Sequence, residues 1–226
     1  MTIGIMQPYF FPYIGYFQLI DAVDVYVNLD HVSFMKRSYM TRNTLKNNTS
    51  INIPVINGSQ NKTCKEVEAD CNPQYWSKFF KTIDQLYKKE SNYKIITDEI
   101  LIPWSNTIQI HPRPISISEF NFSSIYYICE YLGIVKRFYS SGGLTIKKKN
   151  EGLQDITKYF KGDTYINAIG GQKLYNKEDF ASQNINLKFI KMGDVKFDNP
   201  YSSILDLLFR YDKEYIKNEL KKYTLI

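Results

Sequence analysis

The sequence predicts an α/β fold, with a Rossmann-like parallel sheet flanked by helices and a largely helical middle section. In the opening stretch, the apolar run Ile3–Met6, a helical pattern at Phe17–Ala22 and a second apolar run at Val23–Val27 follow one another. Their spacing is about that of a βαβ unit, in which the two strands are parallel. The other indications are a helical pattern at about 72–132 and a later strand-like run at Thr164–Ala168.

The elements expected in the first half, after the opening unit, follow from local signals. Pro54 lacks a backbone N–H and favours an edge position in a strand. Asn72 and Pro73 are typical of a helix start, and Gly133 is typical of a helix end. The expected elements are a strand at Ser50–Ile56, a helix from Asn72 to about Tyr87, a helix at Tyr93–Leu101, an extended segment at Ser105–Ile110, and a helix from Ser116 or Ser118 to Tyr131.

The second half is expected to alternate strands and helices. A strand feeds directly into Gly170-Gly171, so we predict a turn there at the same cleft as the opening unit, with Tyr175 partly exposed in it. The expected elements are a loop at Tyr139–Gly143, a helix from about Glu151 to Phe160, strands at Thr164–Ala168 and Asn186–Met192, a short helix from Asn176 to Ala181, and a pair of helices from Ser202 onward.

The composition is that of an ordinary globular protein. A chain of 226 residues can bury the core of one domain, so we expect a single domain over 1–226 with a helical insert at about 72–132. The 19 tyrosines and 14 phenylalanines exceed what a core needs, which predicts that some line a cleft or an interface. The net charge of +6 fits an anionic partner such as a nucleotide, a nucleotide-sugar, tRNA or a membrane surface, or simply a lysine-rich surface.

The cysteine pattern argues against a metal site and against disulfide bonds. Cys64, Cys71 and Cys129 are odd in number and lack metal-ligand spacing, so neither a zinc site nor a disulfide framework is expected. This pattern favours a reducing cytosol.

No stretch approaches eighteen apolar residues, and the N-terminus lacks the basic start and the cleavage site of a signal peptide, so no membrane insertion is expected.

Polar side chains follow each of the first two expected strands. The carboxyl ends of parallel strands hold ligands in folds of this kind. His31 beside Asp30 is a candidate general base, or else a structural histidine. Arg42 and Asn43 offer donors to an anionic ligand, or else belong to a solvated loop. We predict that the polar residues of both clusters converge on one cleft: Gln7, Asp30, Lys36, Arg42 and Asn43.

The opening MQPYFFPYIGYFQLIDAVDVYV resembles the WbqC-like family, in which a strand is followed by a Gln-Pro…Pro…Gly motif. Many members have His where this chain has Met6, and that difference removes one candidate base. The family is tied to O-antigen and capsule gene clusters, and so to lipopolysaccharide biosynthesis. The resemblance continues, over essentially the whole chain, at Asp30–Asn43, Thr164-Tyr165, Gly170-Gly171, Tyr175, Phe180 and residues 203–208.

A second similarity concerns the fold. Tyr13-Ile14-Gly15-Tyr16 lies where nucleotidylyltransferase-like folds carry a His-x-Gly-His motif, after the first strand and at the start of a helix. The continuation VDVYVNLDHVSF is similar to the corresponding stretch of pantothenate synthetase, an ATP-dependent amide-forming ligase. Tyrosine replaces both catalytic histidines here, so this similarity implies a fold and no activity.

The family resemblance implies a cytoplasmic transferase or ligase that forms an amide. It would join glycine, a related amino acid or another acyl group to the amine of a nucleotide-linked deoxy amino sugar. The donor stays open among an aminoacyl-tRNA, an acyl-CoA, a carrier-protein thioester, and ATP with a free amino acid. The alternative is a non-catalytic protein that binds a nucleotide-sugar or tRNA and assists polysaccharide assembly.

This chemistry assigns roles to the candidate residues. Asp30 or His31 would be the base, and Asn43 and Arg42 are the candidates to stabilise the oxyanion, with Gln7 beside them. Asp206 would bind a sugar hydroxyl or stabilise a helix N-terminus. No metal is expected. The substrate-binding candidates are Gln7, Tyr9, Tyr13, Tyr16, Lys36, Arg42, Gly170, Gly171, Tyr175 and Asp206.

Overall fold

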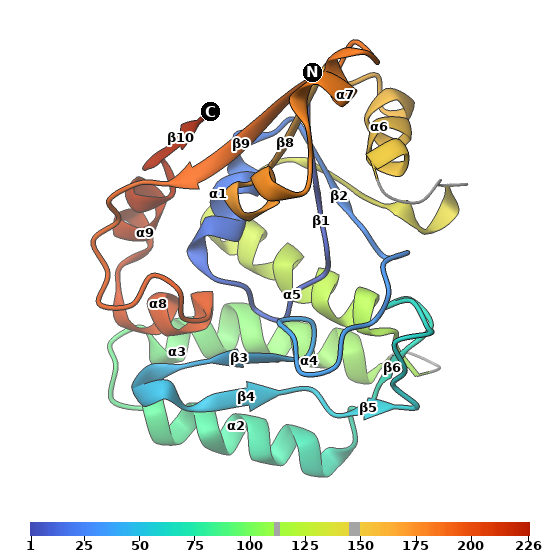
Figure 1. Cartoon of the computed structure of the whole chain (residues 1–226). Coiled ribbons are helices and arrows are strands. Elements are labelled where there is room, and N and C mark those ends of the chain that lie inside the picture. The colour runs from blue at the N-terminus through green and yellow to red at the C-terminus, as the bar shows by residue number, and fades with distance from the viewer. Residues whose placement is uncertain (111–113, 145–149) are drawn as a thin grey trace.

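Six strands form the central sheet, in the order β10–β9–β8–β1–β2–β7 (Figure 1). The structure is a computed structural model that describes residues 1–110, 114–144 and 150–226. Among these, β10 is antiparallel to β9 and the other neighbours in the sheet are parallel. The predicted α/β fold with a largely parallel sheet is therefore confirmed. The strands are β1 Thr2–Met6, β2 Val25–Asn28, β7 Arg137–Ser140, β8 Thr164–Ala168, β9 Asn186–Met192 and β10 Tyr223–Leu225.

The opening unit is the βαβ unit that the sequence predicts. Strands β1 and β2 run parallel, with Ile3 opposite Val25, and helix α1 (Ile14–Ala22) connects them. The helix lies so close to β1 that a Cβ added at Gly4 would come within 2.7 Å of the Leu19 side chain. A glycine in this strand therefore lets α1 cover the sheet.

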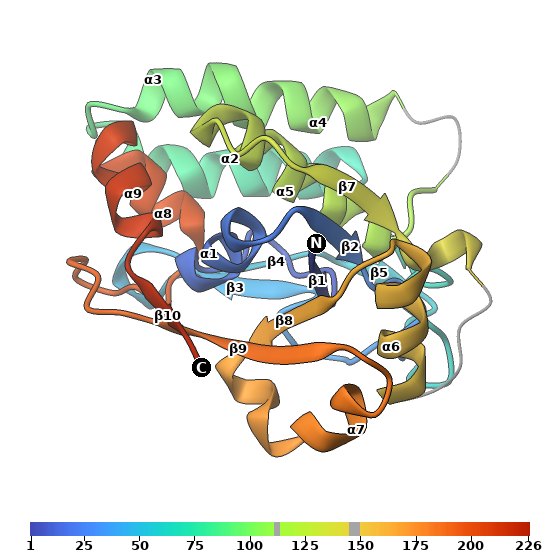
Figure 2. The same cartoon turned by 90° about the horizontal axis from the view of Figure 1, so that it is seen from above.

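Helices cover both faces of the sheet (Figure 2). On one face, Ile3 and Ile5 of β1 belong to a core that Leu153 of α6 and Phe180 of α7 complete. The other face carries a larger core, which includes residues of α1, α5, α8 and α9. These helices are α5 Ile117–Leu132, α6 Asn150–Tyr159, α7 Lys177–Ala181, α8 Ile204–Arg210 and α9 Lys213–Leu220.

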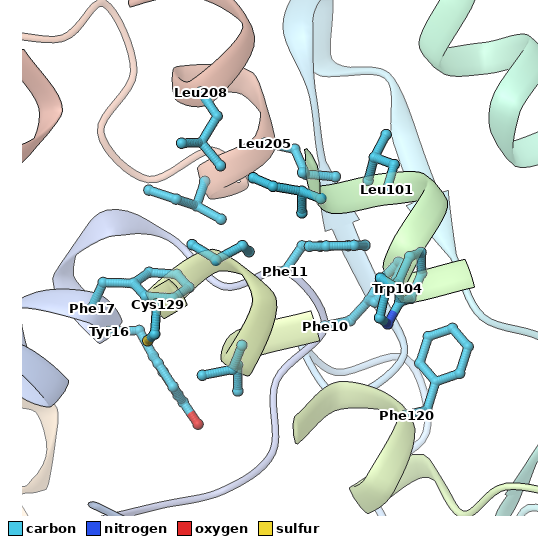
Figure 3. Close-up of a cluster of buried hydrophobic side chains, with 14 of the residues drawn as sticks. Phe10, Phe11, Tyr16, Phe17, Leu101, Trp104, Phe120, Cys129, Leu205 and Leu208 are labelled. Atoms are coloured by element: carbon cyan, nitrogen blue, oxygen red, sulfur yellow. The ribbon is translucent and has the colours of Figure 1, made fainter. Parts of the chain in front are cut away.

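The middle section is helical, as predicted, and packs on the larger core. An aromatic cluster joins it to the loop after β1, where Phe10 and Phe11 contact Trp104 and Phe120 (Figure 3). The middle section comprises α2 Pro73–Tyr87, α3 Tyr93–Ile96, a π-helical turn at Thr97–Leu101, α4 Ile102–Gln109 and α5. None of the described helices is long and apolar enough to cross a membrane.

The expected helix boundaries in this section are also confirmed. The Asn72 side chain accepts a hydrogen bond from the Tyr75 backbone N–H at 3.0 Å, which caps α2 ahead of Pro73. Ser116 and Glu119 form a reciprocal capping box at the start of α5. Gly133 ends that helix in the left-handed region, with φ of 72°.

Three predictions about elements are wrong. Residues 105–109 belong to α4 rather than to an extended segment, because the helical run that starts at Tyr93 continues past Pro103, with the π-helical turn Thr97–Leu101 directly before α4. The expected loop at Tyr139–Gly143 starts inside β7, which pairs with β2.

Pro54 divides the expected strand at Ser50–Ile56, and the two parts of that strand join separate two-stranded sheets. These sheets are β3 Arg42–Thr44 with β4 Ser50–Asn52, and β5 Val55–Ile56 with β6 Glu68–Ala69.

Candidate functional site

A pocket of about 400 Å³ lies where the strand order reverses. From β1 the chain proceeds to β2 and β7 on one side, and it returns to β8 and β9 on the other. Strands β1 and β8 are parallel neighbours, so their carboxyl ends open a crevice between them, which is where such sheets bind ligands. The described lining is uncharged and consists of Ile5, Met6, Gln7, Tyr9, Leu29, Val32, Leu153, Tyr165, Asn167, Ala168, Gly170, Gly171, Leu174 and Tyr175.

The β1 side of the pocket is formed by Gln7 and Tyr9. The Tyr9 hydroxyl donates to the Gln7 side-chain oxygen at 3.2 Å. Beneath them, the Tyr16 hydroxyl donates to the Gln7 carbonyl at 2.7 Å and also contacts the Tyr26 hydroxyl. Tyr16 is only 2% exposed, so it holds the loop from below and does not line the pocket. Met6, at the position where many WbqC-like proteins have His, also lines the pocket, and its thioether cannot act as a base.

The β8 side of the pocket is formed by Asn167 and the turn that follows it. Asn167 is buried, and its side-chain oxygen accepts from the Ala168 backbone N–H at 2.7 Å. Its Nδ2 faces Gly171, where an added Cβ would lie 2.6 Å away. Gly170 and Gly171 lie in the 3-10 turn Ile169–Lys173. Tyr175 is half-buried at the pocket, as the sequence predicts, and burial raises the pKa of its hydroxyl.

Asp30 and His31 follow β2 and stand in the chain between Leu29 and Val32, which line the pocket, although neither is part of the described lining. The Asp30 carboxylate is 3% exposed and accepts from the Ser140 and Ser141 hydroxyls, each at 2.5 Å. His31 is more open, with a side chain 38% exposed. Its Nδ1 lies 3.3 Å from the Asp30 carboxylate and 3.2 Å from the Ser141 hydroxyl. These contacts orient the ring through Nδ1.

The turn after β7 closes tightly over Asp30. A Cβ at Gly142 would lie 2.5 Å from the Asp30 carboxylate and 2.7 Å from Lys65 Nζ. The Lys65 ammonium itself donates to the Gly142 carbonyl at 2.9 Å. From below, the Cys64 thiol contacts the Asp30 carbonyl at 3.1 Å, and burial raises the pKa of this thiol to about 12. Asp30 is thus held from two sides at the carboxyl ends of β2 and β7.

The predicted single cleft forms only in part. Gln7 lines the pocket and Asp30 follows the lining residue Leu29 in the chain, whereas Arg42 and Asn43 belong to β3 in a separate sheet. Both Asn43 amide hydrogens bind backbone carbonyls, at 3.1 Å to Phe10 and 2.7 Å to Phe11. Asn43 therefore ties β3 to the loop after β1 and keeps no N–H for an oxyanion. Its prediction as an oxyanion donor fails on this geometry.

Lys36, Arg42 and Tyr13 occupy the surface around that loop. Lys36 and Arg42 are exposed, and neither lines the pocket as the structure describes it. Their part in substrate binding stays a prediction. Tyr13 precedes α1, lies half-buried over Gly15 and faces Tyr201, with the ring centroids 5.9 Å apart.

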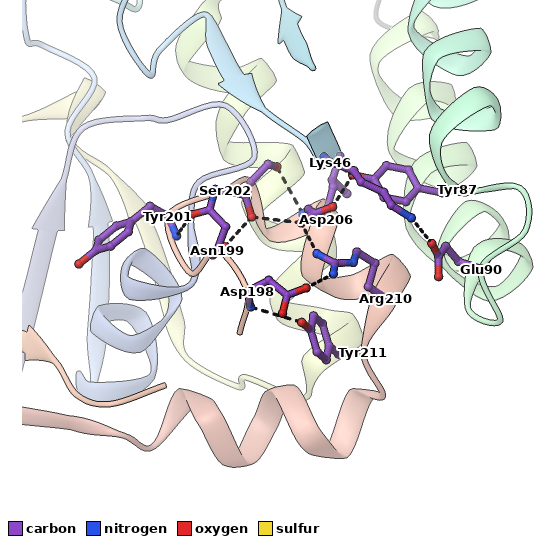
Figure 4. Close-up of polar contacts among 12 residues, drawn as sticks. Lys46, Tyr87, Glu90, Asp198, Asn199, Tyr201, Ser202, Asp206, Arg210 and Tyr211 are labelled. Carbon is purple, nitrogen blue, oxygen red and sulfur yellow. Dashed lines mark hydrogen bonds and ion pairs between the residues drawn. The ribbon is translucent and has the colours of Figure 1, made fainter. Parts of the chain in front are cut away.

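Asp206 belongs to a buried network away from the pocket lining (Figure 4). Its carboxylate accepts from the Tyr87 hydroxyl at 2.7 Å and from Arg210 at 3.2 Å. Arg210 also pairs with Asp198, and the Tyr87 hydroxyl accepts from the Lys46 backbone N–H at 3.0 Å. Of the two predicted roles, this geometry favours the structural one, because the network joins α2, α8 and the segment after β3.

Sequence reasoning missed Asn167, Ser140 and Ser141. Asn167 is the penultimate residue of a correctly predicted strand, and a polar side chain at a strand's carboxyl end is a usable signal. The serines lay in a segment expected to be a loop, so nothing placed them beside Asp30. Among residues 1–110, 114–144 and 150–226, no group of three His, Cys, Asp or Glu side chains is placed to hold a metal.

A largely parallel sheet with a pocket at its point of strand reversal defines an α/β protein of the Rossmann-like class, in which this crevice is the usual place for a small ligand. The chain belongs to the WbqC-like protein family, whose model matches residues 7–218, and this confirms the resemblance seen in the sequence. It is similar to the uncharacterized protein Rv1507c of Mycobacterium tuberculosis (strain ATCC 25618 / H37Rv), with 24% identity over 226 residues and 94% of each chain covered. No solved structure matches the chain.

Proposed function

We propose that this protein transfers an acyl group, such as glycine, to the amine of a nucleotide-linked deoxy amino sugar in O-antigen or capsule biosynthesis. The observation that carries the proposal is the pocket between β1 and β8, whose lining residues Leu29 and Val32 flank the Asp30–His31 pair in the chain. Membership of the WbqC-like family also supports the proposal. The acceptor sugar occupies the pocket in this proposal.

The pocket has the chemistry that a sugar ring requires. Gln7 and Asn167 present side-chain amides, and Tyr9 and Tyr175 present hydroxyls and aromatic faces. Amides and hydroxyls form hydrogen bonds with sugar hydroxyls, and aromatic rings pack against the apolar faces of the sugar ring. The described lining carries no charge, so it offers the sugar ammonium no counter-ion and favours the neutral amine that attacks.

The amine must lose a proton before it attacks. In our proposal His31 Nε2 takes that proton, because Nδ1 is engaged with Asp30 and Ser141. Asp30 positions the ring, since both of its carboxylate oxygens already accept hydroxyl hydrogens. The amine nitrogen then bonds to the acyl carbon and gives its second proton to the leaving oxygen or sulfur as the bond from carbon to that atom breaks. The first proton passes from His31 to solvent.

The tetrahedral intermediate needs a donor for its oxyanion. Asn43 is committed to backbone carbonyls, so we assign this role to Asn167, whose side-chain oxygen is fixed by Ala168 and whose Nδ2 reaches the pocket side. One such donor is typically worth ~3 kcal/mol. An ester of tRNA, a thioester of coenzyme A or a carrier protein, and an acyl-adenylate made with ATP all present the same acyl carbon to the amine.

The direct test is a reaction with defined components. The purified protein is incubated with a dTDP-linked 4-amino-4,6-dideoxyhexose and, in turn, with glycyl-tRNA, an acyl-CoA, an acyl carrier protein thioester, or ATP with glycine. Mass spectrometry of the nucleotide-sugar detects the added acyl mass. We expect product with one donor class, and its loss in His31→Gln. Binding of the nucleotide-sugar without product from any donor would overturn the transferase assignment and favour a binding protein.

A further inference from the structure

Four tyrosines from three segments of the chain gather beside the pocket. Tyr9, which lines the pocket, lies 5.7 Å from Tyr39 between ring centroids. Tyr13 lies 5.9 Å from Tyr201. The two pairs are neighbours, because Tyr9 and Tyr13 stand on the same loop after β1. Burial raises the pKa of Tyr13, and the nearby phenol groups of Tyr201, Tyr9 and Tyr39 add to this effect. We call these residues the tyrosine cluster.

The cluster is built on the loop after β1, which backbone hydrogen bonds hold from both sides. On one side, the Phe10 N–H donates to the Tyr39 carbonyl at 2.8 Å. On the other, the Ile204 N–H donates to the Pro12 carbonyl at 2.9 Å, and the Ser203 hydroxyl donates to the Phe11 carbonyl at 2.8 Å. Tyr39 and the Tyr201 segment are therefore fixed to the loop that carries Tyr9 and Tyr13.

The cluster has a buried half and an open half. Tyr9 and Tyr13 are half-buried, and burial raises the pKa of both hydroxyls. Tyr39 is 58% exposed and Tyr201 is 65% exposed, so their rings are accessible to a ligand. In Figure 4 the Tyr201 side chain points away from the Asp206 network. Large aromatic side chains exposed together on a fixed scaffold mark a binding surface.

We propose that the tyrosine cluster stacks against the nucleobase of the nucleotide-linked sugar, an inference that rests on the proposed function. Tyr9 belongs both to the cluster and to the pocket, so a ligand can occupy both at once. The amides of Gln7 and Asn167 lie inside the pocket and suit the sugar. The open rings of Tyr39 and Tyr201 suit a flat aromatic heterocycle, whose stacking needs no particular hydrogen-bonding pattern.

The test is calorimetric titration with dTDP, with UDP and with the dTDP-linked amino sugar. Tyr39→Ala and Tyr201→Ala are each expected to weaken binding of all three about tenfold, the effect typical of losing one stacked ring. Tyr39→Phe and Tyr201→Phe keep the ring and should bind as the unaltered protein does. Tyr126→Ala is the matched control, because Tyr126 is 47% exposed on α5 and contacts Phe138 instead of the cluster. Thermal melts identify any variant that is misfolded.

The outcomes separate this inference from the proposed function. Equal affinity for dTDP in the unaltered protein, Tyr39→Ala and Tyr201→Ala would overturn the stacking site while leaving the transferase intact. If Tyr39→Ala and Tyr201→Ala bind dTDP and UDP more weakly but the unaltered protein transfers no acyl group from any donor, the stacking site is supported and the transferase function is overturned. Pyrophosphate, which has no base, should bind all variants alike. An equal loss for pyrophosphate would show that the tyrosines act on the phosphates and would overturn the stacking role.

Discussion

The Asn167 side chain and Gly171 are in such close contact that a methyl group at position 171 would lie 2.6 Å from Asn167 Nδ2. The amide cannot easily turn away, because its oxygen accepts the Ala168 N–H at 2.7 Å and the residue is 7% exposed. The same methyl group would lie 3.2 Å from the Tyr175 ring. Gly171 therefore sets the positions of two side chains that face the pocket.

Gly171→Ala is predicted to weaken binding of the dTDP-linked amino sugar by about 1–2 kcal/mol, because the methyl group displaces the Asn167 amide. Calorimetric titration measures the loss. Gly170→Ala is the matched control, since a Cβ there meets nothing within 4 Å. In an Asn167→Ala background the cost of Gly171→Ala should shrink, because the two residues are coupled. Equal costs in both backgrounds would show that Asn167 is not displaced.

Ser141→Ala is predicted to lower kcat while leaving KM unchanged, because its hydroxyl contacts both the Asp30 carboxylate and His31 Nδ1. Loss of that contact changes the orientation of the ring, so the effect should fall on the chemical step and not on substrate binding. His31→Gln should cost ~100-fold or more in kcat, as expected for a general base. Substrate affinity measured by calorimetry should remain unchanged in both variants. A raised KM with an unaltered kcat would contradict the positioning role.

Asp206→Ala is predicted to destabilise the fold by about 1–3 kcal/mol, because it leaves the buried Tyr87 hydroxyl without its acceptor and Arg210 without one of its carboxylates. Urea unfolding measures this change. Tyr87→Phe removes the hydroxyl alone, so a double-mutant cycle isolates the Tyr87–Asp206 hydrogen bond. Affinity for the nucleotide-sugar should not change. Lost affinity with unaltered stability would restore Asp206 as a substrate ligand.

The thiols of the folded protein are predicted to react slowly with Ellman's reagent at about pH 8, because the thiolate is the reactive form. Burial raises the pKa of Cys64 and of Cys71 to about 12, and it raises that of Cys129 as well. Cys71 is the partly exposed thiol and should react first. All three should react at once in guanidinium chloride. Rapid reaction of Cys64 in the folded state would show that the segment beneath Asp30 opens.

The sequence by itself determined the strands that carry the pocket. Hydrophobic runs and helical spacing predicted the β1–α1–β2 unit, and the run at Thr164–Ala168 matches β8 residue for residue. Local signals also fixed the helix ends at Asn72 and Gly133. These features depend on neighbours within a few residues, where backbone dihedrals and caps decide the outcome. The family was recognisable at the same level, from motifs along the chain.

Only the tertiary structure decided what the individual polar side chains do. Asn43 and Asn167 carry the same amide. Asn43 gives its hydrogens to the carbonyls of Phe10 and Phe11, whereas Asn167 holds its oxygen on Ala168 and directs Nδ2 toward the pocket side. Asp206 likewise pairs with Tyr87, which is 119 residues away. A polar group's role depends on which distant partner satisfies it, and that partner is set by packing between segments that local sequence does not specify.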